Sequence, residues 1–472
     1  MREKRQKGVA LVLGALMLLV LVPMIGLGID GGVAYLLRTK LSAAVDAAVL
    51  AGARSLSTGA DIQSQAANAT AVAENYFDAN FPAGTWGSQN PTRSVAVNQD
   101  DNTHVRWVTV TASVDAPLYF MGMLNQQTAH ISLTGTAKRR DVNIMLVLDR
   151  SWSMGAYGNG QHCGNCGAIP GMINAATSFV NQFAQGRDRV GMVVFGGDYY
   201  RVLPTTSFSA LAGQIAQITS SGNTGAAQAL WQAYDALGNI PDQNGNPVGE
   251  PGALNVILFF TDGLPNGITA NFAPLRVSPN TCSFGSISML GWISQTSGFV
   301  LDPGTTRGLF IPVAAAVSDP NDGGSANLIA NRAGCNFAAN SANMYLDFTG
   351  IPAQDYYGNL TNPPNPYKPV DLSGLNRATQ VAAASFNAAD YAAQRMRAGA
   401  INNIVPLVYT ISLLDNPAEP PDAVFMKRVS NTLDSPIYDA TKPAGLYIDT
   451  QSADQLTPAF QRIASEILRL SQ

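Results

Sequence analysis

The sequence predicts an α/β protein with a doubly wound, mainly parallel sheet, preceded by an N-terminal transmembrane helix and a small α+β stalk. First, Gly8–Ile29 carries no charge, and its length as a helix, about 33 Å, is enough to cross a bilayer. Second, Val105–Val114 alternates apolar and polar residues, which is typical of a half-buried strand. Third, Ile144–Leu148 and Val256–Phe260 are continuous apolar runs, which indicate strands buried on both faces of a parallel sheet.

Length and composition predict more than one domain and exclude one class of partner. We divide the 472 residues into a cytoplasmic tip with the transmembrane helix and its extension (1–56), an α+β stalk (57–140) and the α/β domain (141–472). The net charge of −4 and the lack of a long basic run argue against nucleic acid as a partner. The low charged fraction of 13% is compatible with an extracytoplasmic protein.

The N-terminal segment is expected to be an uncleaved membrane anchor. Its apolar run is longer than the core of an ordinary signal peptide, and no convincing cleavage site follows it. Basic residues dominate the first seven positions, which places the N-terminus in the cytoplasm and the chain after Asp30 outside. We therefore expect a single-pass protein of a bacterial inner membrane, with its bulk in the periplasm or at the cell surface. Leu41, Val45 and Val49 recur every four residues, so the helix should continue beyond the membrane.

The stalk should combine a helix with strands and carry no catalytic residues. A helix is expected at Gly59–Phe81, with three candidate buried residues, Ala66, Val72 and Tyr76. After the turn-rich segment PAGTWGSQNP, strands are expected at Val105–Val114 and Ile131–Thr136. Lys138–Arg140 is a short charge run that we interpret as a solvated boundary.

Oxygen-bearing side chains follow two of the buried strands. Asp149 ends the first strand and is followed at alternate positions by Ser151 and Ser153, while Asp262 follows the second strand. Thr224 stands just before an Ala-rich helix. The carboxyl ends of parallel strands are where open α/β sheets bind ligands. Oxygen-only ligands suit a hard divalent cation, Mg²⁺ first, with Mn²⁺ or Ca²⁺ as alternatives.

This D-x-S-x-S string with a distant Thr and Asp resembles the metal-ion-dependent adhesion site of von Willebrand factor A domains. The resemblance implies that the two serines and Thr224 ligate the ion through their hydroxyls. Asp149 and Asp262 would ligate directly or through water, leaving one position open for a partner's carboxylate. Trp152 occupies a variable position that is often Gly, and Trp152 and Arg150 are candidates for ligand recognition.

The N-terminal 55 residues resemble TadG-like proteins of tight-adherence (Flp) pilus systems, through Asp30 just past the apolar run and the pattern L-x-x-A-x-D-A-A ending at Ala48. The resemblance implies a non-enzymatic role in pilus assembly or surface adhesion, with a pilus or other envelope protein as partner. Position 13 is Leu, where processed pilins usually have Glu, so cleavage at Gly8 is not expected. An alternative is a pseudopilin-like scaffold with a passive A domain.

The rest of the α/β domain should alternate strands and helices around one long insertion. The expected helices are Ala175–Phe183, Gly225–Leu237, Ala378–Ala398, Asp422–Val429 and Ala453–Leu470, and the further strands are Val190–Phe195, Tyr199–Leu203, Ile404–Ser412 and Leu446–Ile448. The segment Leu264–Asn376 loses this alternation and is rich in Pro, Gly, Asn and Ser. We interpret it as an ordered insertion next to the edge of the sheet where the expected metal ligands lie.

The four cysteines form a close pair and a distant pair. Cys163 and Cys166 are expected to form a local structural disulfide, with a redox centre or half of a zinc site as alternatives. A disulfide between Cys282 and Cys335 would pin the insertion. The close pair also leaves thiol–disulfide exchange open as a function. No G-x-S-x-G motif occurs, and the three histidines all lie at or before His162, so nucleophilic catalysis is not indicated.

Overall fold

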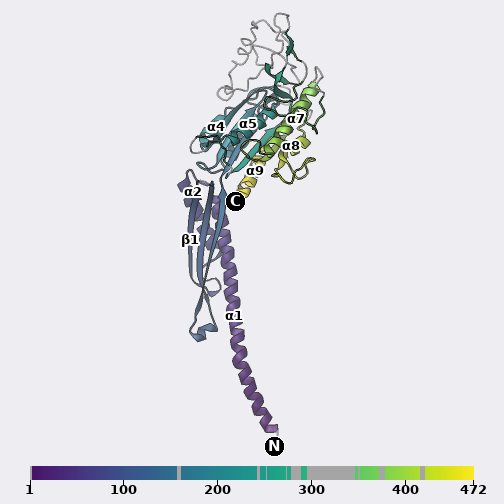
Figure 1. The fold of residues 1–472 in the computed structure, drawn as a ribbon. Coiled ribbons are helices and arrows are strands. Elements are labelled where there is room, and N and C mark those ends of the chain that lie inside the picture. The colour runs from purple at the N-terminus through teal and green to yellow at the C-terminus, as the bar shows by residue number, and fades with distance from the viewer. Residues whose placement is uncertain are drawn as a thin grey trace. The chain divides into compact units, whose positions relative to one another are not determined.

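The chain folds into two compact units, one up to Arg140 and the other spanning Asp141–Ser471 (Figure 1). The computed structural model describes residues 3–101, 103–156, 161–241, 245–250, 252–272, 274–277, 289–294, 346–348, 351–370, 378–414 and 420–471. Each unit has its own hydrophobic core, so each is described by itself.

The first unit is built on one long helix, α1 (Glu3–Ser55), of 53 residues. Its apolar N-terminal half is exposed from Val12 to Ile29 except at Gly26, which is buried, and by length and composition α1 could cross a membrane. In its second half Leu41, Val45 and Val49 are 0–4% exposed and pack in the core of this unit, as their spacing predicts. The same helix therefore carries an exposed apolar part and a part that packs on protein.

Helix α2 (Ile62–Asn80) packs against α1, with a buried face one residue out of phase from the one expected. Asp61 caps the helix, and its carboxylate accepts a hydrogen bond from the backbone N–H of Ser64. The buried residues are Gln65, Ala69, Ala73 and Phe77, whereas Tyr76 is 52% exposed and Ala66 and Val72 are intermediate. The prediction was wrong because alanine is only weakly apolar, so Ala69 and Ala73 did not mark the buried face in the sequence. In the structure their small side chains let α2 pack closely on α1.

A three-stranded antiparallel sheet completes this unit, with strands β1 (Gln89–Asp100), β2 (Val105–Pro117) and β3 (Thr128–Arg140). Two 3-10 turns flank these strands in the chain: η1 (Thr85–Gly87) precedes β1, and η2 (Met121–Leu124) lies between β2 and β3. The sequence analysis missed β1. The charge run at the end of β3 is paired strand and not a linker: Lys138 and Arg140 are exposed, as expected, but Arg139 pairs in register with Arg106, and these two residues are 1% and 2% exposed. Arg106 donates to the side-chain oxygen of Gln65 and the carbonyl oxygen of Leu56. Strand pairing continues to the last residue of this unit and buries Arg139.

The second unit is a doubly wound α/β domain, as predicted. Its six-stranded sheet has the order β13-β12-β7-β4-β5-β6, and all its pairs are parallel except the edge pair of β5 and β6. The strands are β4 (Val142–Asp149), β5 (Arg189–Phe195), β6 (Tyr199–Thr205), β7 (Leu254–Thr261), β12 (Leu407–Leu413) and β13 (Tyr447–Thr450). Every residue of β4 is buried, because helices cover both faces of the sheet.

Two sets of helices cover these faces. On one side the core includes residues of α3 (Ile169–Val180), α4 (Phe208–Ile215) and α9 (Leu456–Leu470). On the other side it includes residues of α5 (Ala226–Gly238), α7 (Ala378–Arg397) and α8 (Ala423–Ser430). The sequence analysis missed α4. The 3-10 turns η3 (Trp152–Gly155) and η5 (Ala453–Gln455) precede α3 and α9.

Part of the expected insertion is regular structure. Strand β8 (Gly267–Phe272) pairs with β10 (Met289–Ser294), and β9 (Pro274–Val277) pairs with β11 (Leu346–Phe348), both antiparallel. Ile268 and Ala270 of β8 are buried in the core beneath α5 and α7. The expectation that regular structure is lost after Asp262 was therefore wrong for these strands. Cys282, Cys335 and most of the expected insertion lie outside the described residues.

Candidate metal centre

The carboxyl ends of β4 and β7 place the first two groups of the candidate site side by side. The strands are parallel neighbours, with Leu148 in register with Phe260. The next residues along the two strands are Asp149 and Thr261, and the Thr261 hydroxyl donates to Asp149 Oδ2 at 2.5 Å. Asp262 follows at once, so both carboxylates lie at the same edge of the sheet.

The serine hydroxyls converge on the second carboxylate. The hydroxyls of Ser151 and Ser153 lie 3.0 Å apart. Ser153 Oγ donates to Asp262 Oδ1 at 2.9 Å, and Ser151 Oγ lies 3.5 Å from the same oxygen. Three residues that the sequence predicts as ligands, from two segments more than a hundred positions apart, therefore form one cluster of oxygens.

Thr224 lies next to this cluster. A Cβ placed on Gly263 would be 3.6 Å from both Ser153 Oγ and Thr224 Oγ1. The backbone of Thr224 is held by Asn266, whose side-chain oxygen accepts from Thr224 N at 2.8 Å and whose own N–H donates to the Thr224 carbonyl at 3.2 Å. A side chain at position 263 would therefore contact both hydroxyls. The structure thus brings all five predicted ligands to one edge of the sheet.

Burial makes the first carboxylate unusual. Asp149 is 0% exposed, and burial raises its pKa to about 6, against hydrogen bonds from the Thr261 hydroxyl and the Ser151 backbone N–H that favour the charged form. A buried carboxylate costs free energy unless a positive charge or hydrogen bonds compensate it. Asp262, 2% exposed, adds a second acidic group at the same edge. This arrangement favours a bound cation.

The donor set fits a hard divalent cation and does not fit zinc. The described residues hold no group of three or more His, Cys, Asp or Glu side chains that could bind a metal, so a cation at this edge would depend on the hydroxyls. Hydroxyl and carboxylate oxygens suit Mg²⁺, Mn²⁺ or Ca²⁺, whereas structural zinc sites use Cys and His. Asn266 and Thr261, which orient the predicted ligands, were missed by the sequence analysis. Thr261 was detectable because it directly precedes Asp262 at the end of a buried strand.

The two recognition candidates differ in exposure. Trp152 is 55% exposed, and its backbone N–H is fixed by a hydrogen bond to the Gly222 carbonyl at 2.9 Å. Arg150 is only 8% exposed, because its guanidinium donates to Asp198 at 2.7 Å and lies 5.6 Å from the centre of the Tyr200 ring. Arg150 therefore ties β4 to the turn after β5, and of the two candidates Trp152 is the one presented to solvent.

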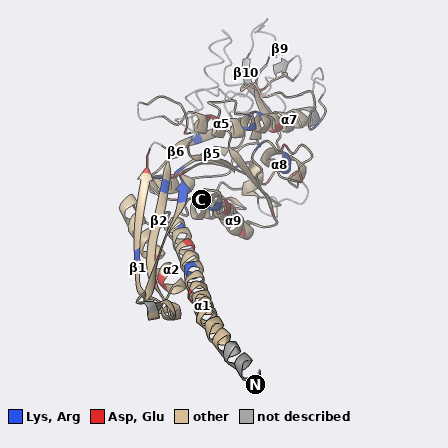
Figure 2. Cartoon of the chain, turned by 60° about the horizontal axis from the view of Figure 1, so that its bottom comes forward, with Lys and Arg blue, Asp and Glu red and all other residues tan. Residues whose placement is uncertain are grey.

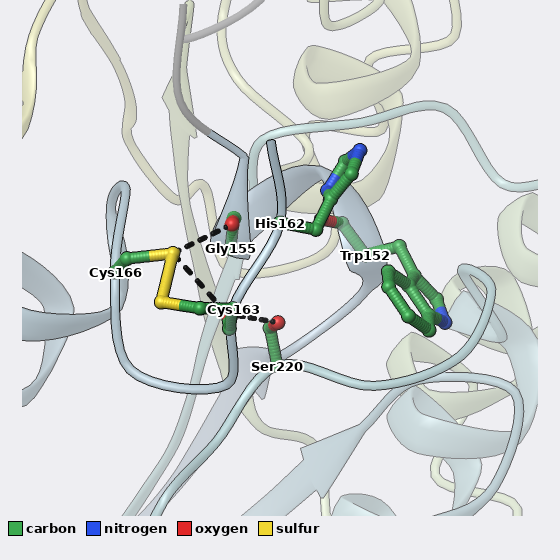
Figure 3. Close-up of a disulfide and its surroundings, with 6 residues drawn as sticks. All are labelled: Trp152, Gly155, His162, Cys163, Cys166 and Ser220. Atoms are coloured by element: carbon green, nitrogen blue, oxygen red, sulfur yellow. Dashed lines mark hydrogen bonds between the residues drawn. A yellow bond between two sulfur atoms is a disulfide. The ribbon is translucent and has the colours of Figure 1, made fainter. Parts of the chain in front are cut away.

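A disulfide supports the loop beside Trp152. Cys163 and Cys166 are bonded to each other, as predicted, and Cys166 is 3% exposed. Figure 3 shows the Ser220 hydroxyl donating to the Cys163 carbonyl, at 3.0 Å. In the same view His162 lies between the disulfide and Trp152, with the two aromatic rings 5.5 Å apart in an edge-on arrangement. The disulfide thus holds an aromatic pair next to the candidate metal centre.

Two family models match the chain. Residues 144–264 match the von Willebrand factor type A domain, so the α/β unit that carries the site is an A domain. Residues 8–55 match the family described as putative Flp pilus-assembly TadE/G-like. The chain therefore joins a TadE/G-like N-terminal segment to a von Willebrand factor A domain, which confirms both resemblances. No curated protein matches the chain.

Solved structures similar to this chain include domains of pilus proteins. The pilus adhesin SpaC from Lactobacillus rhamnosus GG is 15% identical over 80% of this chain and 35% of that one, with a TM-score of 0.36. A mutant of the PilB minor pilin from Streptococcus sanguinis is 12% identical over 80% of this chain and 79% of that one, with a TM-score of 0.38. The vWF domain of the type V pili tip protein Mfa5 from Porphyromonas gingivalis is 16% identical over 71% of this chain and 97% of that one, with a TM-score of 0.36.

Proposed function

We propose that this chain is a binding protein rather than an enzyme. It is anchored in the bacterial inner membrane by α1, with its N-terminus in the cytoplasm and its A domain in the periplasm or at the cell surface. The A domain binds an acidic side chain of a partner protein, a component of a tight-adherence pilus or of the envelope. One observation carries the binding part of this proposal: hydroxyls and carboxylates from three separate segments converge at one edge of the sheet.

Each residue of the cluster has a part in this function. Ser151, Ser153 and Thr224 would hold the cation through their hydroxyls, and Asp149 and Asp262 would balance its charge. The cation, Mg²⁺ first, would offer one position to an oxygen of the partner's carboxylate. Because Trp152 is exposed beside the cluster, its indole would contact the partner around that carboxylate and contribute specificity.

A pull-down from solubilised membranes tests the proposal. The wild-type chain should capture its partner in Mg²⁺ and lose it in EDTA, and Asp149→Ala and Ser153→Ala should abolish capture while circular dichroism shows a folded chain. Asp449→Ala is the matched control, because Asp449 is an exposed aspartate on β13 of the same sheet. Capture that is unchanged by EDTA would refute the metal-dependent mechanism.

Two other functions remain distinguishable. If the A domain is a passive cap on a pseudopilin-like scaffold, a chain truncated after Arg140 should support full pilus output, whereas a binding role predicts loss of output. If Cys163 and Cys166 exchange disulfides with substrates, the protein should reduce insulin in the presence of dithiothreitol. The burial of Cys166 favours a structural bond, for which no insulin reduction is expected.

A further inference from the structure

Two turns lie together at one end of the first unit. Residues 84–88 belong to the connection between α2 and β1, and residues 117–127 comprise the last residue of β2 and its connection to β3. We call these two segments the basal turns. A Cβ on Gly87 would be 3.4 Å from the Tyr119 hydroxyl and 3.6 Å from Pro117 Cγ, so the basal turns contact each other. In Figure 1 the β2–β3 end of the sheet lies alongside the middle of α1.

Asp30 fastens the second basal turn to α1. Its carboxylate accepts hydrogen bonds from three successive backbone N–H groups, those of Tyr119 at 2.8 Å, Phe120 at 3.0 Å and Met121 at 2.8 Å. Asp30 is 1% exposed. It is also the first charged residue after the uncharged run Gly8–Ile29 of α1, and the described part of that run carries no blue or red in Figure 2. The turn is therefore fixed at the level where the apolar run of α1 ends.

Phe120 reaches one helical turn further into the apolar run. A Cβ on Gly26 would lie only 2.7 Å from Phe120 Cβ, so the side chain of Phe120 packs on the bare helix surface at Gly26. Gly26 precedes Asp30 by four residues, or about 6 Å along a helix. If α1 spans a bilayer up to Asp30, Phe120 lies below the outer boundary of the apolar layer.

The basal turns expose apolar and aromatic side chains and carry no charge in their longer segment. Trp86 is 53% exposed, Tyr119 58% and Met123 83%. Residues 116–129 contain no charged residue or histidine, and Asp115 and His130 flank them. Exposed Trp and Tyr side chains collect at membrane–water interfaces, where one end of the ring is buried and the other is hydrated.

The rest of the sheet surface is different. Away from the basal turns its outer face carries exposed hydroxyl pairs, Thr109 with Thr136 at 3.1 Å and Thr111 with Thr134 at 3.0 Å. This face is suited to water. Within the sheet and its turns, the exposed large apolar side chains Trp86, Tyr119 and Met123 all lie in the basal turns, near Asp30.

We propose that the basal turns insert into the outer interface of the lipid bilayer, through Trp86, Tyr119, Phe120 and Met123. This inference rests on the proposal that α1 spans the membrane. The bilayer is the occupant because the apolar surface of the turns continues directly into the exposed apolar surface of α1. Asp30 acts as a latch that holds the turn at this depth, and the core between the second half of α1 and the sheet fixes the rest of the unit on the helix.

Photo-crosslinking of the full chain in vesicles of phosphatidylethanolamine and phosphatidylglycerol tests the inference. p-Benzoylphenylalanine replaces Tyr119 or Met123, and lipid adducts are measured by mass spectrometry. Val20, in the apolar run, reports whether α1 is in the membrane. Ile62, 39% exposed at the start of α2, is the control in the same unit. The expected result is lipid adducts at positions 20, 119 and 123, and none at position 62.

Each other outcome overturns a defined part of the proposal. Lipid adducts at position 20 alone, or crosslinks from position 123 to a second copy of the chain, refute insertion of the turns and leave the membrane anchor standing. No lipid adduct at position 20 refutes the anchor and the inference with it. Asp30→Ala should lower the yield of the lipid adduct at position 123 and leave the one at position 20 unchanged. An undiminished yield of the adduct at position 123 in this variant would refute the latch.

Discussion

Substitution of Thr261 by valine tests whether the buried hydrogen bonds of the candidate metal centre support cation binding. Thr261 is 1% exposed and Asp149 0%, and the bond between them measures 2.5 Å. Valine keeps the branched shape of threonine and removes the donor. The Asp149 carboxylate would then keep its bond from the Ser151 backbone N–H, at 2.7 Å, and lose the one that fixes its other oxygen.

The magnitude follows from the strength of such bonds. A hydrogen bond to a charged group contributes about 1.5–3 kcal/mol, and about 1.4 kcal/mol corresponds to a tenfold change in affinity. Loss of a residue that orients a metal ligand typically lowers metal affinity by about 10–100-fold, so we expect Mg²⁺ binding to weaken in this range. Burial already raises the pKa of Asp149 to about 6. Because loss of the Thr261 bond raises that pKa further, proton competition should make the defect larger at pH 6 than at pH 8.

Isothermal titration of the detergent-solubilised chain with MgCl₂ measures the effect. Thr410→Val is the matched control, because Thr410 is a buried threonine of the same sheet whose hydroxyl donates to the Met426 carbonyl, outside the candidate metal centre. The control should bind Mg²⁺ like the wild type. If Thr261→Val also binds with wild-type affinity at both pH values, the hydrogen bond from Thr261 to Asp149 does not support cation binding and the reasoning fails.

Two further predictions concern the stability of the A domain. Phe460→Ala should lower the free energy of unfolding by about 3–5 kcal/mol, since Phe460 is 0% exposed and its ring centre lies 6.0 Å from those of Phe179 and Phe260. Urea unfolding measures this loss. The control is Leu470→Ala, at a residue of the same helix that is 47% exposed, and an equal loss in this variant would contradict the prediction. Burial raises the pKa of Asp355 from 3.8 to about 7, against hydrogen bonds from Asn359 and Tyr357. The folded chain therefore keeps a proton on Asp355 that the unfolded chain releases. The stabilisation from this proton is complete below pH 3.8 and is lost as the pH rises through about 7. The free energy of unfolding should fall by about 4 kcal/mol in total from this cause. Asp355→Asn should flatten the fall in urea midpoint over this range, and a slope identical to the wild type would show that Asp355 is ionised when folded.

The sequence alone was sufficient for the features that depend on local pattern. The apolar run of α1, its four-residue repeat at Leu41, Val45 and Val49, and the buried strands β4 and β7 follow from hydrophobic periodicity. The residues that the structure brings together at the candidate metal centre were also predictable. Their side chains occupy the ends of parallel strands and a helix start, and parallel strands bring such ends to one edge.

Only the tertiary structure decided the contacts between distant segments. The sequence offers no signal that Asp30 accepts hydrogen bonds from a turn some 90 residues later, that Arg150 pairs with Asp198, or that Arg139 is buried. A charged side chain is read from sequence as solvated, because burying it is costly without partners. Those partners come from the packing of other elements, so the structure alone shows which charges are exposed and which hold the fold together.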